Sequence, residues 1–201
     1  MAKIITIAHQ KGGVGKSTLA INLALCFQDQ LSVALVDTDL QGSLYHSRDD
    51  FPELAIIGAD KLADIEKLAF DLIIVDTPPY LSNKLPELFL RSDFILVPTK
   101  AGFFDVMAVH STIALIQEAI AKSSNIRAGI VLNMVKPRSG ITNDVRGLLE
   151  TLGVQLLETV IHDRVSIARS PMTGGVLQSV DQKAKDEVTS LAEEIVELIC
   201  V

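Results

Sequence analysis

Residues 3–18 read KIITIAHQKGGVGKST, and this stretch decides the fold of the chain. The apolar run over residues 3–9 has the composition of a buried strand, and the eight residues KGGVGKST lead into a helical pattern that begins at Leu19. A glycine loop between a strand and a helix is the setting in which backbone N–H groups surround phosphate oxygens. The stretch therefore predicts a nucleotide-binding α/β domain.

The residues of the loop suit a bound nucleoside triphosphate and its metal ion. Glycine lets the backbone approach the β-phosphate, Lys16 adds a positive charge, and the Ser17 hydroxyl can ligate Mg²⁺. A turn that only joins a strand to a helix has no need of Gly-Lys-Ser, which argues against a purely structural loop. The pattern GxxxxGK[ST] requires glycine at position 10, where this chain has Gln10. The predicted ATP-binding residues of the loop are Gly12, Gly13, Val14, Gly15, Lys16, Ser17 and Thr18.

Short β-branched runs alternate with helical patterns along the whole chain. Most of the runs are continuously apolar, which is typical of parallel strands covered on both faces. We expect one domain over residues 1–201, with a doubly wound, mostly parallel sheet and helices on both faces. Residues 164–175 fit neither pattern and are expected to form an ordered surface loop. The expected strands are 3–9, 32–37, 54–57, 71–76, 93–98, 127–133 and 155–161, and the expected helices are 17–29, 60–69, 82–91, 104–121, 142–152 and 181–199.

Composition limits the class of protein. With 48% hydrophobic residues among 201, the chain can bury a core, and 4% aromatic residues with no Trp argue against binding by base stacking. The net charge of −7 excludes a uniformly basic surface. Two cysteines make no disulfide framework, which favours a reducing compartment. No secretory signal is evident and no apolar stretch is expected to approach the roughly 18 residues of a membrane span, so we expect a cytoplasmic protein without a membrane partner.

Carboxylates follow two of the expected strands. Asp37 and Asp39 stand at alternate positions, so both side chains point the same way at one strand end. Asp76 ends the apolar run 71–76, as does the acid that holds a Mg²⁺-bound water in P-loop proteins. Because ligands bind beyond the carboxyl ends of strands in an open α/β sheet, we predict that these acids lie beside the loop. The metal residues predicted from these patterns are Ser17 and Asp76.

The loop KGGVGKST, with a second lysine at its start, resembles the deviant Walker A motif of the ParA/MinD class of P-loop ATPases. In that class the first lysine, here Lys11, reaches across an ATP-bound homodimer to the phosphates held by the other subunit, as an arginine finger does. Residues 36–43, VDTDLQGS, resemble the VDxDPQGS segment of the class, with Leu40 in the place of proline. The resemblance implies that Asp37 supports the magnesium shell, that Asp39 orients the attacking water, and that Asn133 reads adenine. The implied catalytic residues are Lys11, Lys16 and Asp39.

The resemblance implies a small DNA partition ATPase, whose ATP-bound dimer binds DNA without reading sequence and whose hydrolysis is stimulated by a ParB-like or other small adaptor. Residues 122–169 hold seven basic and four acidic residues, a weak local excess that suits contact with phosphates on the nucleoid. The expected DNA-binding residues are Arg164 and Arg169, with Arg138 and Arg146 as weaker candidates. Residues 161–175 also resemble the C-terminal region of short ParA proteins.

Two alternative functions stay open. One is a positioning ATPase for a protein cargo such as a chemoreceptor cluster or microcompartment, which shares the chemistry and differs in partner. The other is a small-molecule enzyme of the dethiobiotin-synthetase type, for which a lysine acting in trans would be superfluous. The iron–sulfur branch of the superfamily is disfavoured because Cys200 has no partner nearby. The membrane-binding branch is disfavoured because residues 181–201 are acidic.

Overall fold

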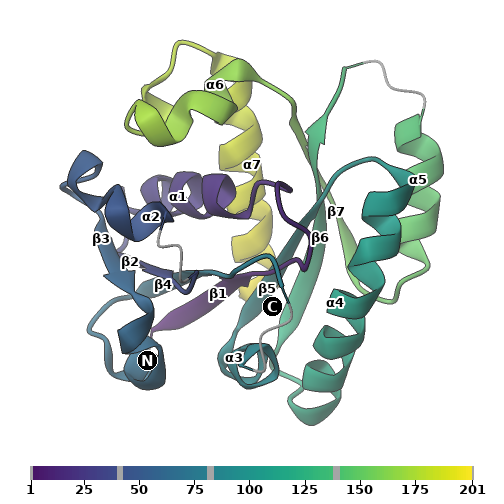
Figure 1. Cartoon of the computed structure of the whole chain (residues 1–201), viewed down its shortest axis with the longest axis horizontal. Coiled ribbons are helices and arrows are strands. Elements are labelled where there is room, and N and C mark those ends of the chain that lie inside the picture. Colours follow the sequence, from purple (N-terminus) through teal and green to yellow (C-terminus); the bar gives the residue numbers. More distant parts are fainter. Residues whose placement is uncertain (1, 40–42, 81–83, 138–140, 201) are drawn as a thin grey trace.

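The computed structural model describes residues 2–39, 43–80, 84–137 and 141–200. Within them, seven strands form one parallel sheet in the order β3-β2-β4-β1-β5-β6-β7 (Figure 1). The predicted doubly wound parallel sheet is confirmed, and β1 lies at its centre. The strands are β1 (Lys3–Ile7), β2 (Val33–Asp37), β3 (Ala55–Gly58), β4 (Leu72–Asp76), β5 (Phe94–Thr99), β6 (Arg127–Val135) and β7 (Gln155–His162).

Helices cover both faces of the sheet. The α-helices are α1 (Lys16–Phe27), α2 (Ser43–His46), α3 (Leu85–Arg91), α4 (Phe103–Lys122), α5 (Ile141–Glu150), α6 (Val165–Arg169) and α7 (Gln182–Ile199). Because successive strand residues point to opposite faces, Ile5 and Ile7 pack in the core beneath α1 and α7, whereas Ile4 and Ala8 pack in the core beneath α3, α4 and α5. This two-sided burial explains the continuously apolar strands.

Five segments differ from the sequence-based expectation. The helix expected over residues 60–69 is a 3₁₀ segment, η2 (Ala59–Lys67), with non-helical backbone at Asp64, and Ile65 is its one buried residue. The expected loop at 164–175 contains α6 and the 3₁₀ turn η3 (Ser170–Met172), and it ends at Gly174 and Gly175, both with positive φ. Neither α2 nor the short turns η1 (Arg48–Asp50) and η4 (Val176–Gln178) were expected. Each has too few residues to show a helical period.

Helix α4 corrects the expectation that no apolar stretch approaches the length of a membrane span. Its 20 residues are long and apolar enough to cross a membrane by length and composition alone. A core helix of a globular domain meets the same criterion. One side of α4, carrying Val109, Ile113 and Ile116, is buried in the core against the sheet.

Candidate active site

Strand register brings the predicted site residues together. Ile7 and Asp37 both pair with Asp76, since β4 lies between β1 and β2. The loop after β1 and the acids that end β2 and β4 therefore meet at one edge of the sheet, as the sequence predicts. A hollow of about 320 Å³ at this edge is lined by the loop together with Asp39, Thr77 and Met134. Its volume falls at the lower end of ligand pockets.

The loop requires glycine at two positions. Gly13 has φ 69° and Gly15 has φ 89°, a left-handed conformation that residues with a side chain rarely adopt. A Cβ atom at Gly15 would also collide with the side-chain amide of Asn133. Gly15 is the N-cap of α1, so the loop delivers unpaired backbone N–H groups of the first helical turn to the hollow. These features fit a bound phosphate chain.

Lys16 is the first residue of α1 and is only 6% exposed. Burial lowers the pKa of its ammonium, while the nearby carboxylates of Asp76 and Asp39 act in the opposite direction. Its Nζ lies 3.4 Å from the carbonyl oxygen of Lys11. Triphosphate oxygens in the hollow would supply the negative charge that a buried cation requires.

Ser17 and Asp76 form the part of the site that suits a metal ion. The Ser17 hydroxyl donates to Asp76 Oδ2 at 2.6 Å, while Asp76 Oδ1 is buried without a hydrogen-bond partner among the described residues. Burial raises the pKa of the Asp76 carboxyl to about 7, against the lowering effect of the Ser17 hydrogen bond. A buried, incompletely bonded carboxylate beside a hydroxyl fits Mg²⁺, which takes few protein ligands and keeps its waters and phosphates.

The two acids after β2 have different surroundings. Asp37 is 2% exposed, and its carboxylate accepts the backbone N–H groups of Asp39, Leu44 and Tyr45, each at 3.0 Å. Asp37 therefore fixes the chain on either side of residues 40–42, and Leu40 itself lies outside the described residues. Asp39 is half-buried and lines the hollow. This arrangement agrees with a supporting role for Asp37 and a role nearer the reacting atoms for Asp39.

Lys11 lies at the rim of the hollow and not within it. Its Nζ donates to Asp105 Oδ1 at 2.6 Å, and its side chain is 41% exposed. Sequence reasoning missed Asp105, which stands in the first turn of α4, 94 positions along the chain, and belongs to no motif. A second contact joins the same elements, because the Ser111 hydroxyl donates to Gln10 Oε1 at 2.8 Å.

His9 was also missed, and it orients the start of the loop. Its Nδ1 accepts the backbone N–H of Lys11 at 2.8 Å, which requires an unprotonated Nδ1. Burial, together with the charges of Lys16 and Lys11, lowers the pKa of His9 to about 4, although Asp105 acts in the opposite direction. His9 is therefore neutral near pH 7 and keeps this acceptor.

Asn133 lies beneath the loop and is 1% exposed. Its Nδ2 donates to the carbonyl oxygen of Val14 at 2.7 Å, and its Oδ1 accepts the N–H of Met134, a residue with φ 55°. The structure thus shows Asn133 bracing the loop. A small hollow of about 40 Å³ lies beside it, between Met134 and residues 162–164. The adenine contact implied by the resemblance stays a prediction.

The two predicted DNA-binding arginines differ in whether the guanidinium group is already engaged within the protein. Arg164 donates through Nε and Nη2 to Glu187 Oε1, at 3.0 and 2.7 Å, and these bonds raise its pKa. His162 contacts the same carboxylate, so Arg164 ties the end of β7 to α7. Arg169, at the end of α6, is exposed. Of the weaker candidates, Arg146 is paired with Glu158 at 3.4 Å and Arg138 lies outside the described residues.

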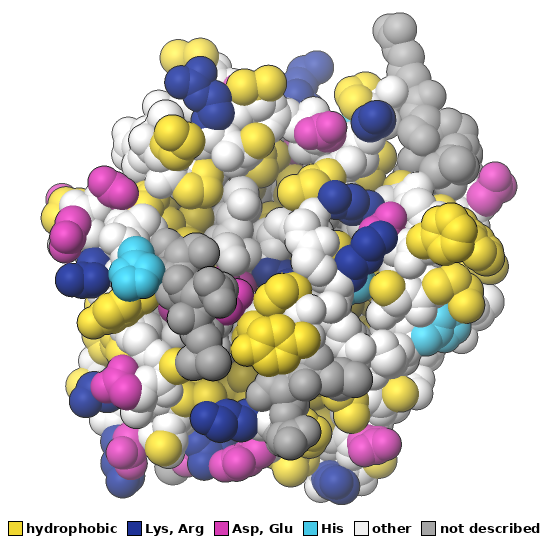
Figure 2. All heavy atoms as spheres, in the orientation of Figure 1, with side chains coloured by type: hydrophobic (Ala, Val, Ile, Leu, Met, Phe, Trp, Pro, Cys, Tyr) yellow, Lys and Arg dark blue, Asp and Glu magenta, His cyan; other side chains and the backbone are white. Residues whose placement is uncertain are grey.

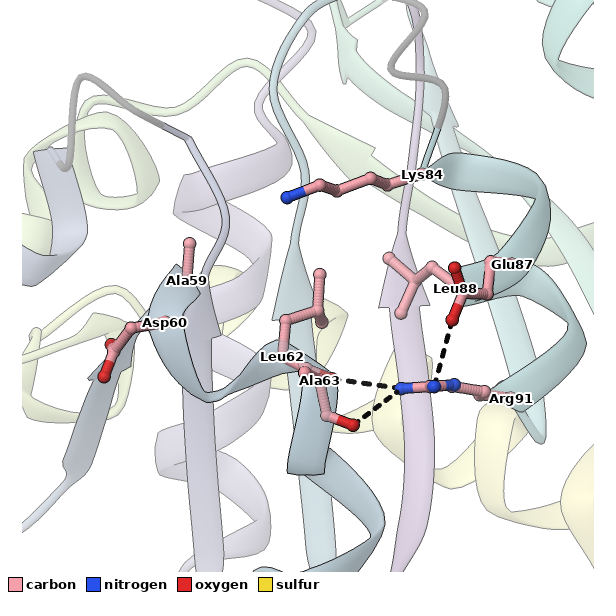
Figure 3. Close-up of a pocket in the computed structure, with 8 residues that line it drawn as sticks. All are labelled: Ala59, Asp60, Leu62, Ala63, Lys84, Glu87, Leu88 and Arg91. Carbon is pink, nitrogen blue, oxygen red and sulfur yellow. Dashed lines mark hydrogen bonds and ion pairs between the residues drawn. The ribbon is translucent and has the colours of Figure 1, made fainter.

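A separate hollow of about 330 Å³ lies between η2 and α3 (Figure 3). Arg91 closes one side of it by donating to Glu87 and to the carbonyl oxygens of Leu62 and Ala63, and Lys84 extends across it. It contains none of the loop residues or the acids of the predicted site. The chemistry described above therefore belongs to the hollow at the loop and not to this one.

Comparison with known proteins defines the class. The family model described as the CobQ/CobB/MinD/ParA nucleotide binding domain matches residues 5–177, and the chain belongs to this family. It is a P-loop ATPase of the ParA/MinD type, and its cofactors are ATP and Mg²⁺.

Individual relatives cover nearly the whole chain. Maintenance of carboxysome distribution protein A of Halothiobacillus neapolitanus is 30% identical over 96% of this chain and 95% of its own length. The chromosome-partitioning ATPase Soj of Thermus thermophilus is 29% identical over 85% of each. Among solved structures, a putative plasmid partition protein of Borrelia burgdorferi bound to AMPPNP covers all of this chain and 99% of its own, at a TM-score of 0.74 and 22% identity. At that identity the likeness shows the fold alone.

Proposed function

We propose that this protein is a cytoplasmic DNA partition ATPase whose ATP-bound homodimer binds DNA without sequence preference and is switched off when an adaptor stimulates hydrolysis. The observation that carries the proposal is that two lysines of the loop occupy different positions. Lys16 is buried in the hollow of its own subunit, whereas Lys11 is held at the rim, where a second subunit can meet it. A cation supplied in trans makes hydrolysis depend on dimerisation.

An exposed apolar patch beside Lys11 supports the dimer. Phe103 is 60% exposed, Phe104 80% and Met107 54%, all in the first two turns of α4. Figure 2 shows a cluster of hydrophobic side chains near charged ones on this face. Asp105, which holds Lys11, belongs to the same two turns of α4, so the patch lies close to the lysine. Exposed aromatic clusters of this kind mark interaction sites.

In the proposed reaction each residue has a separate task. Lys16 and the loop N–H groups bind the phosphates, and Asp39 orients the attacking water by accepting a hydrogen bond from it. Asp37 holds residues 39, 44 and 45 in place by its three hydrogen bonds. Ser17 and Asp76 would hold Mg²⁺, which would neutralise charge on the phosphate oxygens. Lys11 of the partner subunit adds charge at the same oxygens.

Positioning of a protein cargo is the second candidate. It is favoured by the 30% identical relative from Halothiobacillus, whose name assigns it to carboxysome distribution. Partition of DNA is favoured by the Soj relative. The two functions share the nucleotide site and differ in the adaptor. If the protein partitions DNA, its loss would raise the rate at which cells lose a replicon. If it positions a protein cargo, its loss would leave copies of that cargo clustered in the cell.

The test measures dimerisation and DNA binding together. With ATP and Mg²⁺, the parent protein should dimerise by light scattering and bind two unrelated duplexes equally. Lys11→Ala should lower the rate of ATP hydrolysis, whereas Lys122→Ala, which changes an exposed lysine at the other end of α4, should leave that rate unchanged. A parent protein that neither dimerises nor binds DNA with ATP would favour the small-molecule enzyme.

The DNA-binding arginines are tested by a salt series. Arg164→Ala/Arg169→Ala should weaken binding to all duplexes alike and lower the salt slope, since each lost phosphate contact removes about 0.9 from the logarithmic slope. The single variant Arg169→Ala measures the contribution of the exposed arginine apart from that of Arg164, which is paired with Glu187. Arg127→Ala, at the amino end of β6 and therefore at the other end of the strands from Arg164, is the control. An unchanged slope would place the DNA contact on other residues.

A further inference from the structure

A further concave surface lies at the far end of α1 from the nucleotide site. A groove of about 530 Å³ runs between the end of α1 and the last turns of α7. Thr189, Ala192, Glu193 and Val196 form its α7 wall, at the spacing of one helical stripe. The helix α1 has 12 residues, so the groove lies roughly 18 Å from Lys16.

The floor of this groove is apolar and partly open to solvent. Leu31 is 40% exposed and Val196 is 44% exposed, while Phe27 is buried beneath them and Cys26 is half-buried. Helix α7 follows the wall from residue 189 to residue 197, a length of about 12 Å, or two helical turns. The groove therefore has the size and character of a surface that receives one short helix.

The rim of the groove is acidic. Glu193 and Glu197 are exposed one turn apart. Burial raises the pKa of the Cys26 thiol, and the charges of Asp29 and Glu193 raise it further, which places these charges near the floor. No lysine or arginine of the described residues forms an ion pair with these three acids. Two like charges at this spacing repel each other, and a bound cation would relieve that repulsion.

We propose that the groove docks an amphipathic helix of a partner protein whose apolar stripe is flanked by Lys or Arg. The acidic rim favours a basic helix over a second copy of the chain, nucleic acid or anionic lipid. A second copy in a two-fold dimer would set the acidic rim against itself, in a chain of net charge −7. Nucleic acid and anionic lipid would be repelled by the same rim. A basic helix gains both the apolar contact and the charge complementarity.

The docking site does not depend on the proposed function, because among the described residues none that lines the groove also lines the nucleotide hollow. Lys16→Ala, which should remove ATP binding, is expected to leave helix binding unchanged. Failure of the partition ATPase and failure of this inference are therefore distinguishable.

The binding test uses two synthetic amphipathic helices of equal length, one with lysines and one with glutamates beside the same leucine stripe. Fluorescence anisotropy should show binding of the lysine helix and none of the glutamate helix. Val196→Asp should weaken binding by about tenfold, the loss of one good apolar contact, whereas Val180→Asp, at a fully exposed valine, should not. Glu193→Gln/Glu197→Gln should weaken it several-fold, and Glu118→Gln/Glu150→Gln, with the same change of charge, should not.

The location of the bound helix is tested through Cys26. In a Cys200→Ser background, the lysine helix should slow maleimide labelling of Cys26 in the otherwise unchanged protein. Equal binding of both helices, binding that Val196→Asp and the glutamate pair leave unchanged, or unprotected Cys26 would each overturn the proposal. So would a shift in self-association caused by the groove variants, which would make the occupant a second copy.

Discussion

At the amino end of the sheet, Asp93 accepts hydrogen bonds from Lys3 Nζ at 2.8 Å and from the N–H of Ile4 at 2.9 Å, one on each carboxylate oxygen. At the carboxyl end, Asp76 is buried with one oxygen unpartnered, and burial raises its pKa to about 7. Both acids flank strands that pair with β1. Both oxygens of Asp93 are used in hydrogen bonds within the protein, whereas one oxygen of Asp76 keeps its bonding capacity for a ligand. A carboxylate with an unused hydrogen-bond acceptor thus distinguishes the carboxyl end of the sheet, at Asp76, as the binding edge from the amino end, at Asp93, as the structural edge.

The largest effect expected at the binding edge comes from Lys16→Ala. Removal of the buried ammonium takes away the positive charge that faces the β- and γ-phosphates, so ATP binding should be lost. Titration with a fluorescent ATP analogue measures it, with Lys122→Ala as the control. Unchanged affinity would mean that the hollow at the loop is not the nucleotide site.

Asp39→Ala should stop hydrolysis while leaving ATP binding intact. The change removes a group that orients water but no group that contacts phosphate, so an ATP-bound dimer should accumulate. Phosphate release and light scattering follow the two effects, and Asp163→Ala provides an exposed aspartate as the control. Hydrolysis at the parental rate would remove Asp39 from the mechanism.

Asp105→Asn tests whether the cis ion pair restrains Lys11. Without its partner, Lys11 should be freer to reach a second subunit, and half-maximal dimerisation with ATP should need up to about fivefold less protein, the limit set by a partly exposed ion pair. Asp64→Asn breaks the Lys67 pair, which has the same 2.6 Å separation on the surface, and should change nothing. Dimerisation that needs more protein would show that Asp105 supports the dimer.

The smallest effect is expected at the structural edge. Asp93→Ala leaves the Ile4 N–H without its acceptor and should cost about 1 kcal/mol of unfolding free energy, or roughly 2–4 °C in Tm. ATP affinity should stay at the parental value, since the change lies at the opposite end of β1 from the loop. Thermal unfolding and nucleotide titration of one sample measure both. A change in ATP affinity would weaken the contrast between the two edges.

The sequence motifs predicted which residues meet at the carboxyl end of the sheet, because each motif is a short local stretch of sequence. The runs 3–9 and 71–76 are apolar on both faces, which indicates parallel strands, and the order of strand ends then places Asp37 and Asp76 together. The partners of the loop were not predictable. Asp105 meets Lys11 only because β5 lies beside β1, and no spacing in the sequence encodes that neighbourhood. Asn133 resembles a base-reading residue, yet its amide is used on the Val14 carbonyl.

The short helices were missed for a different reason. A segment of four or five residues cannot show a 3.6-residue period, so α2 and α6 depend on their tertiary setting. Asp37 accepts the Leu44 and Tyr45 N–H groups at the start of α2, which is a contact across the turn. At 60–69 the helical pattern exists, but with Ile65 alone buried it does not enforce α-helical geometry.

Asn22, inside α1, joins the helix that follows the phosphate-binding loop to residues 170 and 176. Its side chain donates to Thr18 O and Ser170 Oγ and accepts the Val176 N–H, over separations of up to 154 residues. The helix that carries Lys16 is therefore tied to residues near the end of the chain, and it also packs against α7, so its contacts are complete only after nearly the whole chain has left the ribosome. Such long-range closure is slow, and it makes ATP capture a late event in folding. A nascent chain stalled before Ser170 should fail to retain ATP.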